Sequence, residues 1–378
     1  MSCIHQLRRL SAGLPSALIT TPSKLKHAHC DPKIPSIQYH HLLRRLNSNQ
    51  SQNTHVPKIS SNHRHKGGNS PPPYILWGVI LPTAGLTVTC IYAYNSCLEC
   101  VPCTNRKRFI VTSPEWEART GHDQYRSYLN VFGNNILPKD HRATVTVARV
   151  GSRIAEAAKV FNREYHGTNP NTSLPFTYTV VRSDDANAFV LPGNHVFVMT
   201  GLFRYVHNED ELASILGHEI AHNLARHAGE RVSQNFIVKM LSYLMLVIDP
   251  SGMLFNFFVP AEALFYSLPH SREHEIEADE IGFILSSEAC YDPRSAKKVF
   301  ARMKHNADCG DKSTATPPEF ISTHPGYETR LSNFDEWMPT AMERFNRNDG
   351  QKCRAIRQEM KRARSLAAKS HDDKERFG

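Results

Sequence analysis

The chain has 378 residues, enough for one large domain or two small ones. Its net charge of +9 would suit a nucleic-acid partner, but residues 1–73 hold ten basic residues and one acidic residue, so the remainder is neutral. The basic character therefore belongs to this leader, and no nucleic-acid-binding face is predicted.

The leader, residues 1–73, is rich in Ser, Asn and His and contains paired arginines at Arg8–Arg9 and Arg44–Arg45. This composition predicts a mitochondrial targeting segment, because a secretory signal would have a short apolar stretch near its start. The alternative is a plain basic tail. Low apolar content predicts disorder in either case.

Residues 74–94 contain no charge and are long enough to cross a bilayer as one transmembrane helix, with Trp77 and Tyr92 at interfacial positions. A buried soluble helix is the alternative. Residues 95–140 are predicted to be a juxtamembrane linker. Within it Cys97, Cys100 and Cys103 are a weak signal for a metal or redox site, since no fourth ligand is nearby.

Residues 141–340 predict a catalytic domain of mainly helical α+β class, followed by a charged helical tail at 341–378. Helical spacing covers residues 142–161, while residues 176–181 and 187–199 predict short strands of a small sheet. Asn208 and Glu211 form a capping box that begins a central helix. The apolar runs at 236–248 and 253–266 favour core helices over a hairpin at a membrane interface.

His218-Glu219-Ile220-Ala221-His222 is the main chemical motif of the chain. Two histidines four residues apart lie on one face of a helix, where they can bind a single Zn²⁺. Glu219 lies about 100° further round the helix and can reach a water on the metal as a general base. The alternative is a helix that carries two histidines by chance.

A catalytic zinc site needs a third protein ligand. A metzincin would have a histidine at the position of Ala228, and His227 is one residue away, so this class is excluded. Glu275 and Asp279 are four residues apart on a predicted helix, which offers one ligand and one carboxylate to hold a ligating histidine. A solvated acidic helix face is the alternative.

These motifs together carry a family resemblance. H-E-I-A-H, then S-R-x-x-E-x-E-A-D, with N-A-F-x-x-P-G upstream and T-H-P downstream, resembles the membrane-bound gluzincins that include the HtpX heat-shock protease and the CAAX prenyl protease. The basic leader, the single predicted span and Thr104–Phe109 are most similar to the Oma-type mitochondrial inner-membrane metalloendopeptidases. The resemblance covers residues 101–330.

The resemblance implies one zinc ion per chain, held by His218, His222 and Glu275, with Glu219 as the base and Asp279 orienting His222. It implies an edge strand that aligns substrate by β-addition, formed by Asn187, Ala188 and Phe189 with His195, Val196 and Phe197. His324 and Arg330 would approach the oxyanion or hold the helix of Glu275.

The resemblance also implies a location and substrates. Protein substrates would be stress-exposed proteins of the inner membrane, cleaved on the side of the intermembrane space, with the lipid bilayer as a second partner and a homo-oligomer allowed. The chain contains no phosphate-binding loop, so ATP-independent cleavage is expected. The alternatives are a related gluzincin of another membrane and a membrane-tethered quality-control binder with structural zinc.

Overall fold

The computed structural model describes residues 73–165, 169–262, 268–309, 320, 323–324, 327–347, 350–362 and 365. The described part is mainly helical with two small sheets, as the sequence predicts. Nearly all of the predicted targeting segment lies outside the described residues.

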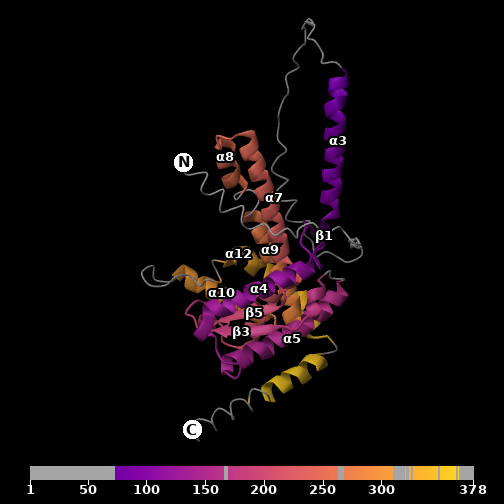
Figure 1. Ribbon diagram of the computed structural model, residues 1–378. Coiled ribbons are helices and arrows are strands. Elements are labelled where there is room, and N and C mark those ends of the chain that lie inside the picture. Colours follow the sequence, from indigo (N-terminus) through magenta and orange to yellow (C-terminus); the bar gives the residue numbers. More distant parts are fainter. Residues whose placement is uncertain are drawn as a thin grey trace.

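Helix α3 (Pro73–Ser96) forms where the membrane span was predicted and extends away from the catalytic domain (Figure 1). Its side chains at Leu86, Val88 and Ile91 are exposed. Within the described ranges, no helix combines the length and the apolar character needed to cross a membrane. The predicted span is therefore not confirmed.

A short antiparallel hairpin follows α3 and connects it to the domain. It consists of β1 (Leu98–Cys100) and β2 (Lys107–Phe109). The rings of Tyr94 and Phe109 stack with centroids 5.2 Å apart, which joins α3 to the hairpin. The Cys103 thiol is 3.8 Å from the Glu280 carboxylate. Cys97 and Cys103 are free thiols, whereas Cys100 is disulfide-bonded, and none of the three belongs to a group of metal donors found in the described part of the chain.

The second sheet has three strands, β3 (Thr177–Val181), β4 (Ala188–Leu191) and β5 (His195–Met199), in the order β3-β5-β4. Strand β5 is parallel to β3 and antiparallel to β4, so it is the central strand. Placing His195, Val196 and Phe197 on a substrate-binding edge was therefore wrong. Sheet order depends on pairing between distant segments, which the strand patterns do not encode.

Helices α5 (Arg142–Glu164) and α6 (Glu209–Leu224) pack against this sheet on the side of the main core, and α10 (Arg294–Cys309) packs against α6. Helix α4 (Pro114–Phe132) covers the other face, where Tyr125 and Phe132 pack with Phe197 of β5. The 3₁₀ turns are η2 (Gly133–Asn135), η3 (Pro170–Ser173) and η4 (Thr200–Arg204). The apolar face of α5, including Val150 and Ile154, packs in one core with Leu216 of α6 and Val198 of β5. Helix α6 is buried along almost its whole length.

The predicted cap of α6 is present. The Asn208 side chain accepts a hydrogen bond from the Glu211 backbone N–H, and the Glu211 carboxylate accepts one from the His207 N–H. Helix α9 (Leu268–Glu288) crosses α6 where Gly217 meets Gly282. A Cβ on Gly282 would lie 2.7 Å from the backbone N of His218, so the two helices approach closely only because both residues are glycine.

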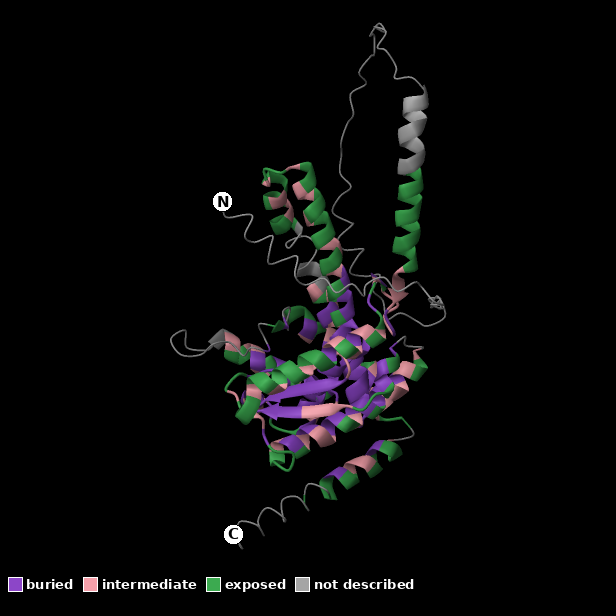
Figure 2. Cartoon of the chain, in the orientation of Figure 1, coloured by how far each residue is buried: buried purple, intermediate pink, exposed green. Residues whose placement is uncertain are grey.

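Helices α7 (His227–Ile248) and α8 (Met253–Glu262) project from the domain as a hairpin, in the same direction as α3 (Figure 1). The prediction that these two apolar runs form core helices was wrong. The exposed fraction is 55% at Met240, 77% at Val247 and 73% at Phe257. Apolar composition predicted burial, but little of the domain packs against this hairpin (Figure 2).

Helix α12 (Tyr327–Phe345) and a helical segment at 351–362 follow. A disulfide joins Cys290 to Cys353, and Met360 is buried. The sequence alone did not indicate this disulfide. It attaches the C-terminal segment to the residues that directly follow α9.

Candidate metal centre

Four side chains from three segments bring potential metal donors together. His218 and His222 come from α6, Glu275 from α9, and His324 from the segment before α12. One donor atom of each lies within 4.8 Å of all the others. The two helices that were predicted to supply ligands therefore do meet, and His324 joins them.

The distances within this group fit a small ion. Nε2 of His218 is 3.0 Å from Nε2 of His222 and 3.4 Å from Oε2 of Glu275, and Nε2 of His222 is 3.5 Å from Oε1 of Glu275. Two ligands of tetrahedral Zn²⁺ at their usual bond lengths are about 3.3 Å apart. The imidazole and carboxylate donors are those that zinc takes in catalytic sites.

Glu219 lies beside this group and is 2% exposed. Its Oε1 is buried and, among the described residues, accepts no hydrogen bond; Nε2 of His324 lies 3.4 Å away. Burial raises the pKa of Glu219. A buried carboxylate oxygen without a partner indicates that a further polar group belongs at this point.

His218 is held from behind by Asp279 and Arg330. Nδ1 of His218 is 2.8 Å from Oδ1 of Asp279, and Arg330 donates to both oxygens of that carboxylate at 2.5 and 2.8 Å. Although burial opposes the charged imidazole, hydrogen bonds to Asp279 and Glu275 raise the pKa of His218 to about 9. Assigning Asp279 to His222 was wrong, because the crossing of α9 over α6 places this carboxylate against His218.

His222 has a different neighbour. Its Nδ1 is 2.8 Å from Nδ1 of His227, and Nε2 of His227 is 3.1 Å from Oε2 of Glu277. Burial lowers the pKa of His222 well below its ordinary value and lowers that of His227 to about 4, so both rings are neutral at pH 7. His227 and Glu277 were not predicted as site residues. The signal available in the sequence for His227 was that it follows His222 by only five residues.

His324 lies at the open side of the group. Nδ1 of His324 is 2.8 Å from Oε2 of Glu275, and its backbone carbonyl accepts a hydrogen bond from Arg330. The side chains of His222 and His324 keep 13% and 11% exposure, so solvent reaches the centre between them. Arg330 also lies 3.7 Å from Glu275, consistent with its predicted contact to the helix of Glu275.

The predicted substrate-strand residues divide into two groups. Ala188 and Phe189 belong to β4, which packs against α6, and Asn187 directly precedes it. No strand pairs with the outer edge of β4 in the described ranges, whereas β3 is bridged on its outer side by Ile136. His195 instead packs inside the domain, with Nδ1 2.7 Å from the Thr177 hydroxyl.

Comparison with known proteins identifies the class of this protein. The model of Peptidase family M48 matches residues 145–338, which lie within the predicted catalytic domain. The chain belongs to peptidase family M48 and is a metallopeptidase, as the sequence motifs predicted.

Individual relatives narrow this assignment. The mitochondrial metalloendopeptidase OMA1 of Schizosaccharomyces pombe is 35% identical over 68% of this chain and 71% of its own length. OMA1 of Saccharomyces cerevisiae is 31% identical over 69% and 74%, and the Homo sapiens protein is 27% identical over 71% and 51%. The chain is thus an Oma-type metalloendopeptidase, which confirms the resemblance drawn from its motifs.

Proposed function

We propose that this chain is a zinc-dependent, ATP-independent endopeptidase that cleaves proteins at the mitochondrial inner membrane. The observation that carries the proposal is the meeting of His218, His222 and Glu275 beside Glu219, whose buried Oε1 accepts no hydrogen bond within the described residues. Three protein ligands and a neighbouring carboxylate base are the requirements of a catalytic zinc site.

Each residue of the centre has a role in this mechanism. His218, His222 and Glu275 hold the ion, which when bound supplies a Lewis acid that polarises the scissile carbonyl and activates water. Glu219 accepts a proton from the attacking water and passes it to the leaving amine. Its raised pKa makes the protonated form, which donates in the second step, more accessible than at an exposed glutamate.

His324 is assigned to the developing oxyanion. Its Nδ1 is occupied by Glu275 at 2.8 Å, while its Nε2 points to the side of Glu219 at 3.4 Å. A donor on that side stabilises negative charge as it forms on the carbonyl oxygen. The competing role is a fourth zinc ligand, which would close the site and make the zinc structural. His324→Ala decides between them: the proposed role predicts lost turnover with zinc retained, and the structural role predicts lost zinc.

Substrate would be aligned on the outer edge of β4, at Ala188–Leu191. This edge packs close to α6, and an extended peptide added there would form main-chain hydrogen bonds alongside the centre. The proposal moves the predicted substrate strand from both β4 and β5 to β4 alone, because β5 is paired on both sides.

The catalytic domain would be held at the membrane by α3 and the α7–α8 hairpin and would face the intermembrane space. Support comes from their shared direction in Figure 1 and from the exposed apolar side chains on both. The relatives named above as mitochondrial support the organelle. Val247→Glu should weaken binding of the full chain to cardiolipin-containing vesicles, whereas Val131→Glu, at an equally exposed valine on α4, should not. Equal binding by both variants would contradict the role of the hairpin.

A purified, lipid-reconstituted chain tests the enzymatic proposal. We expect one zinc ion per chain, cleavage of an unfolded protein substrate without ATP, loss of cleavage with a chelator and recovery with added zinc. Cleavage that persists after complete removal of metal would overturn the proposal. Proteomic comparison of mitochondria that contain either the wild type or Glu219→Gln would then identify the physiological substrates.

A further inference from the structure

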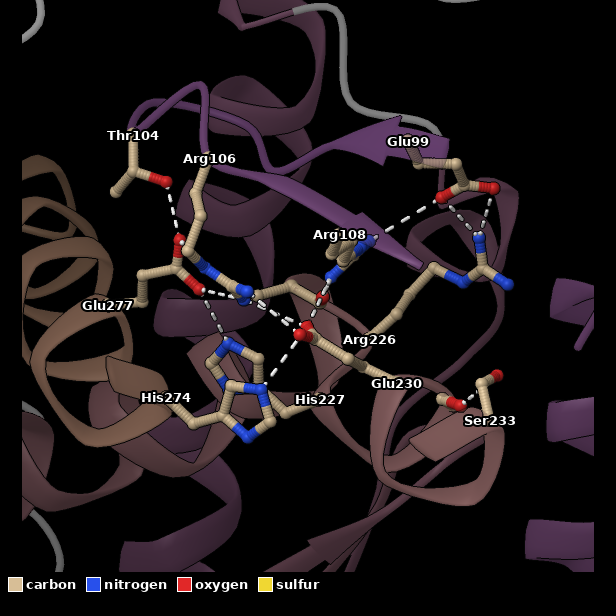
Figure 3. A network of polar contacts seen from close by, with 12 residues as sticks. Glu99, Thr104, Arg106, Arg108, Arg226, His227, Glu230, Ser233, His274 and Glu277 are labelled. Carbon is tan, nitrogen blue, oxygen red and sulfur yellow. Dashed lines mark hydrogen bonds and ion pairs between the residues drawn. The ribbon is translucent and has the colours of Figure 1, made fainter. Parts of the chain in front are cut away.

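A chain of contacts leads from the β1–β2 turn through Glu277 to His227 (Figure 3), and His227 in turn contacts His222 of the metal centre. Arg106 donates to both carboxylate oxygens of Glu277 at 3.0 and 2.8 Å, and the Thr104 hydroxyl donates to Oε1 at 2.5 Å. Oε2 of Glu277 is 3.1 Å from Nε2 of His227, and Nδ1 of His227 is 2.8 Å from Nδ1 of His222. None of these residues except His222 belongs to the group of metal donors.

The hydrogen-bonding capacity of these groups allows one consistent arrangement of protons. An ionised Glu277 only accepts, so Nε2 of His227 must carry a proton and its Nδ1 must hold a lone pair. That lone pair can accept only if Nδ1 of His222 carries a proton. Nε2 of His222 then has its lone pair free, on the side where Nε2 of His218 and Glu275 lie. The chain of contacts therefore selects the tautomer of His222 that binds a metal.

We propose that Glu277, acting through His227, positions His222 as a metal ligand, and that Thr104 and Arg106 fix Glu277 for this purpose. This proposal rests on the proposed zinc site. It gives the two histidines of α6 separate supports, since the Asp279 carboxylate, itself held by Arg330, contacts His218, whereas Glu277 acts on His222 through His227. Groups that hold a ligating histidine raise its basicity and fix its ring orientation.

The burial of Glu277 and His227 in this chain of contacts supports a positioning role. Glu277 is fully buried and His227 is 1% exposed, so neither can exchange its partner for water. Arg106 also pairs with Glu230 at 2.8 Å, and Glu230 lies 3.2 Å from His274, whose ring stacks on His227. The ring of His227 is thus fixed on its face as well as at both nitrogens (Figure 3).

The proposal also assigns a function to the segment Thr104–Phe109, which the catalytic motif does not explain. This segment follows α3 by only a few residues, and its turn is closed by a hydrogen bond from the Val101 N–H to the Arg106 carbonyl. Two of its side chains reach Glu277 on α9. The order of the metal centre therefore depends on the stretch of chain that joins α3 to the domain.

Two substitutions at His227 provide the test. Asn places an acceptor oxygen close to the position of Nδ1 and can still bind the His222 N–H, whereas Leu cannot. Both lose the contact with Glu277, so a merely structural role predicts the same result for both. We expect His227→Leu to raise the zinc Kd of the full chain by roughly 10- to 100-fold, and His227→Asn to stay much closer to the wild type.

Zinc affinity is measured by competition with a chelator on the lipid-reconstituted full chain. Glu211→Gln is the matched control, because it alters a buried glutamate paired with Arg302 at the far end of α6 and should leave the zinc Kd unchanged. If His227→Leu does not fold, Glu277→Gln replaces it, with an expected increase in Kd of about tenfold. Equal Kd values for Leu, Asn and wild type would overturn the positioning role. Absence of zinc binding by the wild type would instead overturn the proposed function.

Discussion

Replacing Arg330 by methionine removes the cation that compensates the buried carboxylate of Asp279. Both side chains are 1% exposed, and two hydrogen bonds of 2.5 and 2.8 Å join them. Methionine retains most of the apolar packing against Phe300, whose ring centre is 4.6 Å from the guanidinium carbon. The substitution therefore tests the charge more than the volume.

The expected loss is large. Removing one partner of a buried ion pair costs roughly 3–5 kcal/mol when the remaining charge is uncompensated. Here His218, 2.8 Å from Asp279 and with a pKa raised to about 9, still compensates part of this charge at pH 7, so the lower end of the range, about 3 kcal/mol, applies. The lost hydrogen bond to the His324 carbonyl, 3.0 Å long, adds about 1 kcal/mol. A free energy of unfolding lower by about 4 kcal/mol is thus expected, a substantial part of the 5–15 kcal/mol typical of folded domains.

Urea denaturation of the metal-free chain at pH 7 measures this loss. The double variant Asp279→Asn with Arg330→Met removes the remaining charge while an oxygen still accepts from Nδ1 of His218. It should be at least about 1 kcal/mol more stable than Arg330→Met alone. A loss below about 1 kcal/mol for the single variant, or no recovery in the double variant, would refute the account of this pair.

Three further predictions concern the surroundings of the centre. Burial raises the pKa of Glu280 from 4.5 to about 7, so ionisation of Glu280 destabilises the fold as pH rises through this interval. In urea denaturation, Glu280→Gln should have a free energy of unfolding higher than that of the wild type by an amount on the order of 3 kcal/mol at pH 8, and no higher at pH 4. Equal gains at both pH values would contradict this. Gly282→Ala should weaken zinc binding and lower the free energy of unfolding by about 1–3 kcal/mol, because its Cβ would lie 2.7 Å from the His218 backbone; wild-type affinity by chelator competition would be inconsistent with the close crossing. Cys353→Ser removes the disulfide to Cys290, 63 residues away, and should lower the free energy of unfolding by about 2–4 kcal/mol. In thermal melts, the variant should unfold at the same temperature as wild type whose disulfide has been reduced. If neither the variant nor the reduced wild type melts at a lower temperature than the oxidised wild type, the disulfide adds no stability.

Local patterns predicted the features that depend on local geometry. The cap of α6 at Asn208 follows from hydrogen bonds within one turn, and the shared face of His218 and His222 follows from helical spacing. Glu275 was proposed because a zinc site needs a third ligand and because Glu275 shares a helix face with Asp279. These inferences required no knowledge of how the elements pack.

Contacts between distant segments were not predictable in the same way. Whether Asp279 meets His218 or His222 depends on where α9 crosses α6, which two glycines determine. The central place of β5 depends on its parallel pairing with β3. The contact between Arg106 and Glu277 joins residues 171 positions apart, and no periodicity relates them.

The prediction that the α7–α8 hairpin is buried failed for a different reason. An apolar run shows that a segment avoids water, but a lipid surface satisfies this requirement as well as a protein core does. Exposed residues such as Val247 and Phe257 make the distinction only once the packing is known. The alternative for this segment, a hairpin at a membrane interface, is the one taken up in the proposed function.

The central claim is that Glu219 is the base of a zinc endopeptidase. Glu219→Gln keeps the size of the side chain and all three proposed ligands but removes the proton acceptor. We predict that the purified variant still binds one zinc ion per chain while its kcat falls by roughly 10²- to 10⁴-fold. Unchanged proteolysis with zinc fully bound would contradict the claim.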